Sequence, residues 1–523
     1  MPSPAKPDSS RALAALRRRV RIGAVLLATA ACFARGGRTP GPPAEPAATF
    51  EQRVKEYESL REQAAKRAGE LPKGQADAAR LAERQQDLAF EIRVARADAE
   101  RGAIFDAETS RAITSLIARE MDPETRHAVV SGNPRVEEAP APSEKAPEKP
   151  TPVKLDVNAP YPPEAPLSTV PPNLLALLPS LPQSLEYRFV GPHLILEDPE
   201  ARLIVDYILN AAGEPMASAP PPAPPSPGPS GRAKPVAPLP RTLGIVLPRL
   251  EDSLRFAVLG DSGSATSAQY EVGRRMAEAR ARFPFEFVVM LGDNLYGSQR
   301  AVDFVQKFEK PYQALLSAGV KFHASLGNHD DPAQVNYKHF NMGGKRYYSY
   351  KPKEDVCFFA LDSNYLDKEQ LAWLQKELRS STAKWKICFF HHPLYSSGRK
   401  HGGLEAAREV LEPLFMENGV DVVFSGHEHF YERLKPQQGV HYFISGAAGK
   451  LREADIRQQS PVSARGFDTD LSFMLVEIAG DGMYFQVLSR AGRTVDGGVI
   501  RRNDATAGTL PDRAPARQAE PAR

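Results

Sequence analysis

The stretch Phe287-Val288-Val289-Met290-Leu291-Gly292-Asp293 decides the fold class, because it is a short apolar run that ends in glycine and a carboxylate. Four further apolar runs end in a polar residue, three of them after glycine: Phe256–Asp261, Ala324–Asn328, Ile387–His391 and Val422–His427. Short β-branched and aromatic runs of this kind predict buried strands. In layered α/β proteins, sites form where such strands end and the chain turns. We therefore expect an α/β fold whose polar strand ends meet on one rim.

The side chains at and just after these strand ends have the chemistry of metal ligands. They are two carboxylates, an amide, a phenol and three imidazoles: Asp261, Asp293, Asn328, Tyr296, His391, His427 and His429. A carboxylate can bridge two ions through its two oxygens, and Asp293, in the middle of the set, is the candidate. Hard oxygen donors mixed with imidazoles suit iron, manganese or zinc. Two such ions about 3.5–4 Å apart can clamp a phosphate for in-line attack.

The composition bounds the class of protein. A chain of 523 residues should hold more than one domain, because single cores stop growing at roughly 250–300 residues. With 67 basic against 64 acidic residues, the net charge of +3 gives no reason to expect a nucleic-acid partner. Nine of the eleven histidines fall between His323 and His441, which favours metal binding and proton transfer in that part of the chain.

Cysteine usage points away from a disulfide-stabilised protein. The three cysteines, Cys32, Cys357 and Cys388, are too few for a disulfide framework. Cys357 and Cys388 lie inside apolar runs, and we interpret them as small buried hydrophobes. A bridge between these two is the alternative.

Residues 1–34 predict a signal peptide or a membrane anchor. The basic segment Arg17–Arg21 precedes the apolar segment Ile22–Phe33, which is too short to span a bilayer comfortably. A lipoprotein signal at Cys32 is a third alternative, although Thr29 stands where a lipobox has leucine. All three alternatives predict export, so we expect a periplasmic, secreted or membrane-anchored protein. We expect membrane contact only through this segment, if it is uncleaved or lipidated.

The remaining chain divides by composition into segments. Residues 50–136 should be helical, as a coiled coil or as a solvated helical hairpin or stalk. Residues 155–212 should form a small accessory β module, with strands at Leu185–Val190, His193–Leu196 and Arg202–Ile208. Residues 246–500 carry the strand-end motifs and alternate strands with helices such as Gln269–Ala281 and Leu366–Arg379. The connecting segments are a linker at 35–49, disordered segments at 137–154 and 501–523, and a proline-rich linker at 213–245.

The five motifs together resemble those of the calcineurin-like metallophosphoesterases. The matching blocks are Gly260-Asp261-Ser262-Gly263, Gly292-Asp293-Asn294-Leu295-Tyr296, Gly327-Asn328-His329-Asp330, His391-His392-Pro393 and Gly426-His427-Glu428-His429. All five occur in order over roughly residues 254–490, although any single block would be a weak signal. The resemblance implies a four-layer α/β/β/α sandwich, here preceded by the helical segment and the small β module.

One substitution points to a subgroup of this family. Most metallophosphoesterases carry Asp-x-His in the first block, but Gly263 stands in place of that histidine. Tyr296 occurs where the purple acid phosphatases, the tartrate-resistant type included, place a phenolate ligand. One ligand lost and one gained would keep the first metal site filled, so the chain resembles the purple type. This resemblance implies Fe(III) with a visible colour, together with Fe(II), Zn or Mn.

The resemblance also assigns roles to individual residues. Metal one would take Asp261, Asp293, Tyr296 and His429, and metal two would take Asp293, Asn328, His391 and His427. His329 should face the substrate, where it would stabilise the transition state or protonate the leaving alcohol. His401 and His392 are both candidates for a second substrate-facing histidine, and the motif does not separate them. We interpret Tyr431-Glu432-Arg433 as support for the site.

The function implied by the resemblance is phosphate-ester hydrolysis. A metal-bound hydroxide would attack a phosphate monoester in line, with an acidic optimum as in an acid phosphatase. A phosphodiesterase or nucleotidase on the same scaffold is the alternative within this class. A third reading is an envelope protein whose residues 50–210 bind a partner, with the phosphoesterase domain secondary.

Overall fold

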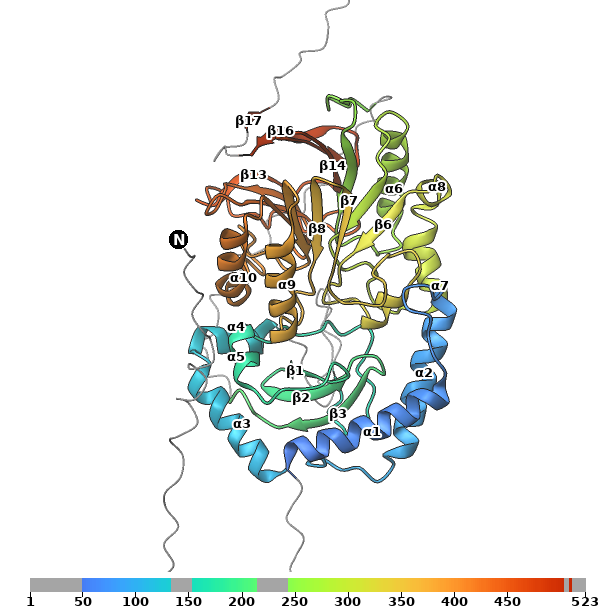
Figure 1. The fold of residues 1–523 in the computed structure, drawn as a ribbon, viewed down its shortest axis with the longest axis vertical. Helices are drawn as coiled ribbons and strands as arrows, with labels where there is room; N and C mark the ends of the chain where they lie inside the picture. Colours follow the sequence, from blue (N-terminus) through green and yellow to red (C-terminus); the bar gives the residue numbers. More distant parts are fainter. Residues whose placement is uncertain (1–48, 133–152, 214–242, 503–507, 510–523) are drawn as a thin grey trace, which may run out of the picture. The chain divides into compact units, whose positions relative to one another are not determined.

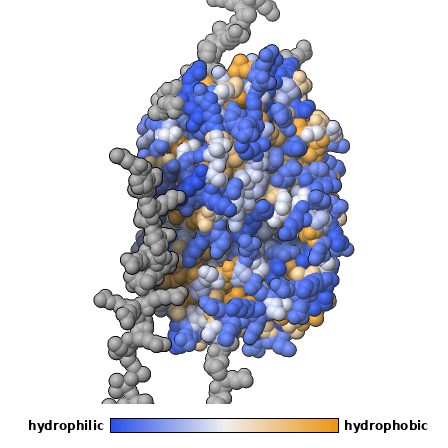
Figure 2. All heavy atoms as spheres, viewed as in Figure 1, coloured by the Kyte–Doolittle hydropathy of each residue, from blue (hydrophilic) through white to orange (hydrophobic). Residues whose placement is uncertain are grey.

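The computed structural model describes residues 49–132, 153–213, 243–502 and 508–509 (Figure 1). The predicted signal peptide or anchor at 1–34 lies outside the described residues, as do most of the predicted linkers and tail. Residues from Thr49 onward cluster as one compact unit. Among the residues that are described, no helix has both the length and the apolar character needed to cross a bilayer. Hydrophilic residues predominate on the face shown in Figure 2.

Within the described residues, two seven-stranded sheets carry the strand-end motifs. The first sheet has the order β17-β16-β15-β14-β4-β5-β6. Its strands are β4 (Leu254–Leu259), β5 (Phe287–Met290), β6 (Lys321–Ala324), β14 (Ser472–Ala479), β15 (Gly482–Ser489), β16 (Thr494–Arg501) and β17 (Gly508–Thr509). Strands β4, β5 and β6 are parallel, so their carboxyl ends meet at one edge.

The second sheet has the order β13-β11-β12-β10-β9-β8-β7. Its strands are β7 (Tyr348–Lys353), β8 (Val356–Ala360), β9 (Trp385–Phe390), β10 (Val422–Ser425), β11 (Tyr431–Leu434), β12 (His441–Ser445) and β13 (Ser463–Phe467). Strands β8, β9, β10 and β12 are parallel. The β9 and β10 ends are therefore adjacent, as the ends of β4 and β5 are in the first sheet.

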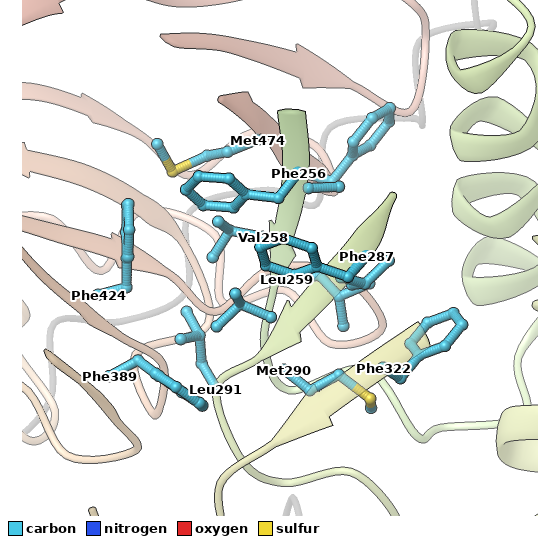
Figure 3. Packing of buried hydrophobic residues seen from close by; sticks show 14 of the residues in the cluster. Phe256, Val258, Leu259, Phe287, Met290, Leu291, Phe322, Phe389, Phe424 and Met474 are labelled. Atoms are coloured by element: carbon cyan, nitrogen blue, oxygen red, sulfur yellow. The ribbon is translucent and has the colours of Figure 1, made fainter. Parts of the chain in front are cut away.

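Aromatic side chains pack the two sheets face to face. The Phe256 ring of β4 lies 5.2 Å from the Phe358 ring and 6.3 Å from the Phe424 ring of the other sheet, measured between centroids. Phe287 of β5 lies 5.6 Å from Phe358. Figure 3 shows Phe389 and Phe424 packed in the same cluster as Phe256 and Phe287. Burial of this apolar surface holds the strand ends of both sheets together.

Helices cover the outer face of each sheet. Helix α6 (Ser267–Arg280) packs on the first sheet through Val272, Met276 and Ala279. Helices α9 (Lys368–Ser380) and α10 (Glu405–Asn418) pack on the second sheet through Leu374, Leu378, Leu411 and Phe415. The short helical segments α7 (Ala301–Phe304), η1 (Val305–Glu309) and α8 (Gln313–Ser317) connect β5 to β6, and η2 (Pro332–Asn336) lies between β6 of the first sheet and β7 of the second. The predicted four-layer α/β/β/α sandwich is confirmed.

The N-terminal half folds as helices around a three-stranded antiparallel sheet. The helices are α1 (Phe50–Ala68), α2 (Ala78–Ala95), α3 (Ala107–Glu120), α4 (Pro123–Gly132) and α5 (Pro172–Leu177), and the strands are β1 (Glu186–Val190), β2 (His193–Asp198) and β3 (Leu203–Ile208). Val54, Leu88 and Ile117 are buried in one cluster with Phe189 and Leu194 of the sheet. The helices are therefore neither a coiled coil nor a solvated stalk, because the sheet covers their apolar faces.

Cys357 and Cys388 are both buried free thiols. Their interpretation as small hydrophobes is confirmed, and the bridge considered as an alternative does not form.

Replacing Phe256 by alanine should destabilise the protein strongly, because the ring is fully buried between the sheets. A loss of about 3–5 kcal/mol in the free energy of unfolding is expected for such a truncation. Phe90→Ala on α2 is the matched control, because this ring is 58% exposed, and a change within about 0.5 kcal/mol is expected there. Chemical denaturation of both variants measures the difference. An unchanged free energy of unfolding in Phe256→Ala would contradict the packing described.

Candidate dinuclear metal site

Each predicted ligand lies just beyond a parallel strand. Asp261 follows β4, Asp293 follows β5, and Asn328 follows β6, while His391 follows β9 and His427 follows β10. Three of these residues have left-handed backbone angles, with φ of 55° at Asp261, 50° at Asp293 and 67° at His427. Such angles cost free energy for residues other than glycine and persist where the surrounding structure enforces them, often at functional sites.

The first group of ligand atoms surrounds the phenol of Tyr296. Its hydroxyl donates to Asp261 Oδ1 at 3.0 Å and lies 3.0 Å from His429 Nε2. His429 Nε2 is itself 3.5 Å from Asp261 Oδ1. Ligand atoms of Asp261, Asp293 and His429 all lie within 4.8 Å of one another. These four side chains could therefore contact one ion.

The second group brings together an amide oxygen and two imidazole nitrogens. Asn328 Oδ1 lies 2.9 Å from His391 Nε2 and 3.2 Å from His427 Nδ1, and the two nitrogens are 3.1 Å apart. The other nitrogen of His391, Nδ1, lies 2.9 Å from the Leu291 carbonyl. The tautomer that donates from Nδ1 to this carbonyl keeps the lone pair of Nε2 directed into the group. Three acceptor atoms facing one point suit a cation.

Asp293 stands between the two groups. Its carboxylate is grouped with Asp261 and His429, and its Oδ1 lies 3.4 Å from His391 Nε2 of the second group. The same oxygen accepts the backbone N–H of His329 at 2.9 Å. A carboxylate in this position can bridge two ions.

The electrostatics of the site favour cation binding. Burial and the neighbouring Asp293 raise the pKa of Asp261 well above its usual range. Burial lowers the pKa of both His427 and His429, so both rings are neutral and keep lone pairs for a metal. Burial and Asp261 raise the pKa of Tyr296. Two cations would relieve the repulsion between the carboxylates and favour the phenolate, so the donor set fits a pair of metal ions.

Comparison with known proteins agrees with this chemistry. Residues 254–431 match the model of the calcineurin-like phosphoesterase family. This part of the chain is a calcineurin-like phosphoesterase domain. Purple acid phosphatase 17 of Arabidopsis thaliana is 27% identical over 291 residues, which cover 46% of this chain and 86% of the relative. Human (Homo sapiens) tartrate-resistant acid phosphatase type 5 is 27% identical over 305 residues, which cover 48% and 93%.

The resemblance to the purple acid phosphatase subgroup is thus confirmed, and the phosphoesterase domain is that of a metal-dependent phosphoric ester hydrolase. Among solved structures, purple acid phosphatase PPD1 from seeds of yellow lupin (Lupinus luteus) is 18% identical. The match covers 48% of this chain and 54% of that chain, with a TM-score of 0.41. A score this low supports no further conclusion.

The three histidines predicted to face the substrate differ in their surroundings. His329 is half-buried, and its ring lies 4.8 Å from the Tyr296 ring. His401 is exposed, with its ring 4.5 Å from that of His427. His392 is buried, and its Nδ1 lies 2.9 Å from Ser363 Oγ. His401 is therefore the most exposed of the three, whereas His392 groups with His391 and His427 as side chains that could hold a metal ion.

Asp330 supports the phosphoesterase site, although the motif alone gave it no role. Its carboxylate accepts backbone N–H groups from Gly327 at 2.8 Å, Asn294 at 3.0 Å and Leu295 at 3.0 Å. It thereby joins the loop that carries Tyr296 to the loop that carries Asn328. Burial and the nearby Asp293 raise the pKa of Asp330. The signal that could have identified it is an acidic residue directly after the Asn-His pair.

Glu428, between the predicted ligands His427 and His429, organises the loop that carries His401. It accepts the Gly402 N–H at 2.8 Å and pairs with Arg452 at 3.2 Å. Arg452 also lies 3.3 Å from His401 Nε2. Nothing in the motifs identified Arg452, because it lies beyond the last block. Glu432 also supports this loop by accepting the Ser397 N–H at 3.0 Å.

Tyr431 and Arg433, which we grouped with Glu432 as support for the site, instead contact Asp496 of β16 at 2.7 and 2.8 Å.

The missing histidine at Gly263 has a steric reason. A Cβ atom at this position would lie 2.0 Å from the Asn294 carbonyl oxygen and 2.5 Å from Leu295 Cα. The Tyr296 N–H donates to the Gly263 carbonyl at 3.0 Å. The backbone that presents Tyr296 therefore occupies the space that a side chain at 263 would need.

Gly263→Ala should disrupt the phosphoesterase site, because the new Cβ would overlap backbone atoms that cannot move independently. We expect a lower melting temperature and loss of bound metal, measured by calorimetry and elemental analysis. Gly244→Ala is the control, since nothing lies within 4 Å of a Cβ added there and its φ is not left-handed. Normal metal content in Gly263→Ala would show that the backbone packing around Tyr296 is not as described.

Proposed function

We propose that this protein is a dinuclear-metal phosphomonoesterase of the purple acid phosphatase type. The observation that supports it is the position of Asp293 between two groups of ligand atoms, one of which contains the Tyr296 phenol. Metal one would be held by Asp261, Asp293, Tyr296 and His429, and metal two by Asp293, Asn328, His391 and His427. Fe(III) is proposed for the phenolate side, and Fe(II), Zn or Mn for the other.

The residues around the ligands suit a phosphate ester. Two bound cations would supply a water of lowered pKa and positive charge for the phosphate oxygens. The backbone of His329 is fixed by Asp293 and by Gln299, whose amide donates to the His329 carbonyl at 2.6 Å. We propose that its ring hydrogen-bonds the phosphate. His401, whose ring lies 4.5 Å from that of His427, is the second histidine that we propose to face the substrate.

Two basic side chains add positive charge near the first ligand group. Lys450 Nζ lies 4.2 Å from the centroid of the Tyr296 ring, and Arg452 lies beside His401. Positive charge at the rim of a site attracts anionic substrates. This arrangement supports a phosphate-ester substrate without naming its alcohol.

Tyr296→Phe should abolish the visible absorption band of the purified full-length protein, because the band requires a phenolate on iron. The wild-type protein should be coloured and should hydrolyse p-nitrophenyl phosphate in the acid range. Tyr350→Phe is the matched control. That buried hydroxyl has no hydrogen-bond partner among the described residues and lies on a ring stacked at 3.9 Å against His323, so its loss should leave colour and turnover unchanged.

A colourless, iron-free wild-type protein that turns over only with added manganese would contradict the purple assignment. Faster hydrolysis of bis-p-nitrophenyl phosphate or of nucleotides than of simple monoesters would favour a phosphodiesterase or nucleotidase on the same scaffold.

We further propose that residues 1–34 direct the enzyme out of the cytoplasm, on the basis of the basic and apolar segments described above. Sequencing the N-terminus of the mature protein by mass spectrometry should show a start after residue 30 if the segment is cleaved. An intact N-terminus in a cytoplasmic fraction would contradict export.

A further inference from the structure

The N-terminal half contacts the metal site at the backbone of Asn328. The Leu167 N–H donates to the Asn328 carbonyl at 2.6 Å, while the Asn328 side chain belongs to the second ligand group. Leu167 is buried in a cluster with Val190, Ile195 and Ile204, one from each strand of the three-stranded sheet. The sheet therefore fixes the donor that holds this ligand residue.

The segment before Leu167 is fixed as well. The Tyr161 hydroxyl donates to the Pro166 carbonyl at 2.8 Å, and Tyr161 is itself buried in the same cluster as Leu167. The Tyr161 N–H donates to the Arg202 carbonyl at 2.7 Å. These contacts therefore hold residues 161–167 against the three-stranded sheet.

Arg188 of β1 joins this segment to a second loop of the site. Its Nη1 donates to the Ser168 carbonyl at 2.7 Å and to the Asn364 carbonyl at 2.8 Å. Ser363, the neighbour of Asn364, accepts the His392 N–H at 3.0 Å. Arg188 is 1% exposed, so these bonds lie in a closed environment. One guanidinium thus holds both Leu167's segment and the turn that supports His392.

Buried charges also join the N-terminal half to the phosphoesterase domain. Glu186 pairs with Arg188 and also with Arg346 of the phosphoesterase domain. Arg346 pairs in turn with Asp362 at 3.3 Å and Asp367 at 3.2 Å. Removing one partner of a buried ion pair leaves an uncompensated charge and is strongly destabilising. The two halves therefore share one ionic network, which argues against a detachable adaptor role for residues 50–210.

We propose that Leu167 is a positioning residue of the phosphoesterase site, whose backbone N–H orients Asn328 toward the second metal. This inference rests on the proposed function. Leu167 acts through Asn328 and does not touch substrate, and Arg188 keeps it in place. Groups that orient metal ligands in this way typically contribute about 10–100-fold to metal affinity or activity.

The test uses the full-length protein and two variants at the same position. Leu167→Pro removes the N–H donor, while Leu167→Ala keeps the donor and removes apolar contacts. We expect Leu167→Pro to bind about one equivalent of metal instead of two, with kcat about 10–100-fold lower. Its visible band should persist, because Tyr296 lies in the other ligand group. Leu167→Ala should bind two equivalents despite a lower melting temperature.

A second measurement needs no substitution, in case the proline variant does not fold. Hydrogen exchange of a peptide spanning residues 163–170 is followed by mass spectrometry in metal-loaded protein and after chelation. Because metal binding fixes Asn328, loading should slow exchange of the Leu167 amide about 10-fold or more. Equal exchange in the two states would overturn the inference.

The outcomes separate this inference from the proposed function. A wild-type protein that binds fewer than two metals would overturn both. A wild-type protein with two metals and phosphatase activity, together with a folded Leu167→Pro variant that also keeps two, would overturn the positioning role alone. Loss of metal from Leu167→Ala to the same extent as from Leu167→Pro would likewise overturn it, since apolar packing would then explain the effect.

Discussion

Burial of two neighbouring carboxylates is the constraint on which the rest of the site depends. Asp261 and Asp293 are 0% and 1% exposed, at the ends of adjacent parallel strands. Burying charge without compensation is costly, and burial lowers the pKa of His427 and His429, so these two rings do not supply it. Bound cations would supply that compensation, and the surrounding lone pairs are placed to receive them. The cations that would balance the buried carboxylates are the same groups that would act on a phosphate ester.

Contacts from the packed sheets and from neighbouring loops hold Asp261 and Asp293 in backbone conformations that cost free energy. The left-handed backbone at Asp261 and Asp293 is supported below by the aromatic packing between the sheets. From the side, Asp330 gathers backbone donors from both loops. A side chain at position 263 would overlap the backbone that presents Tyr296, and glycine avoids this overlap. The glycine at position 263 is thus tied to how two loops pack, as well as to the change of ligand that we propose.

The strands, and the meeting of polar side chains at their ends, were predictable because both have local signatures. That these side chains bind metal stays a prediction. The apolar runs that end in Asp293 and His427 predict where each strand ends and which polar side chain follows it. The role of the N-terminal half was not predictable, since its decisive contact joins the backbone atoms of Leu167 and Asn328, and backbone groups carry no signature in a sequence. The buried faces of α1 and α2 were visible as apolar spacing, but the pattern could not say that a sheet would cover them. Arg452 belongs to no motif, so only the fold brings it beside His401.

The ionic network around Glu186, Arg188 and Arg346 holds the two halves of the chain together independently of the covalent link between them. The stretch between residues 213 and 243 joins two halves that already share buried charges, an apolar cluster containing Tyr365, and a backbone hydrogen bond at Asn328. A protease that cut this stretch would produce two polypeptides on a denaturing gel and a single particle in solution.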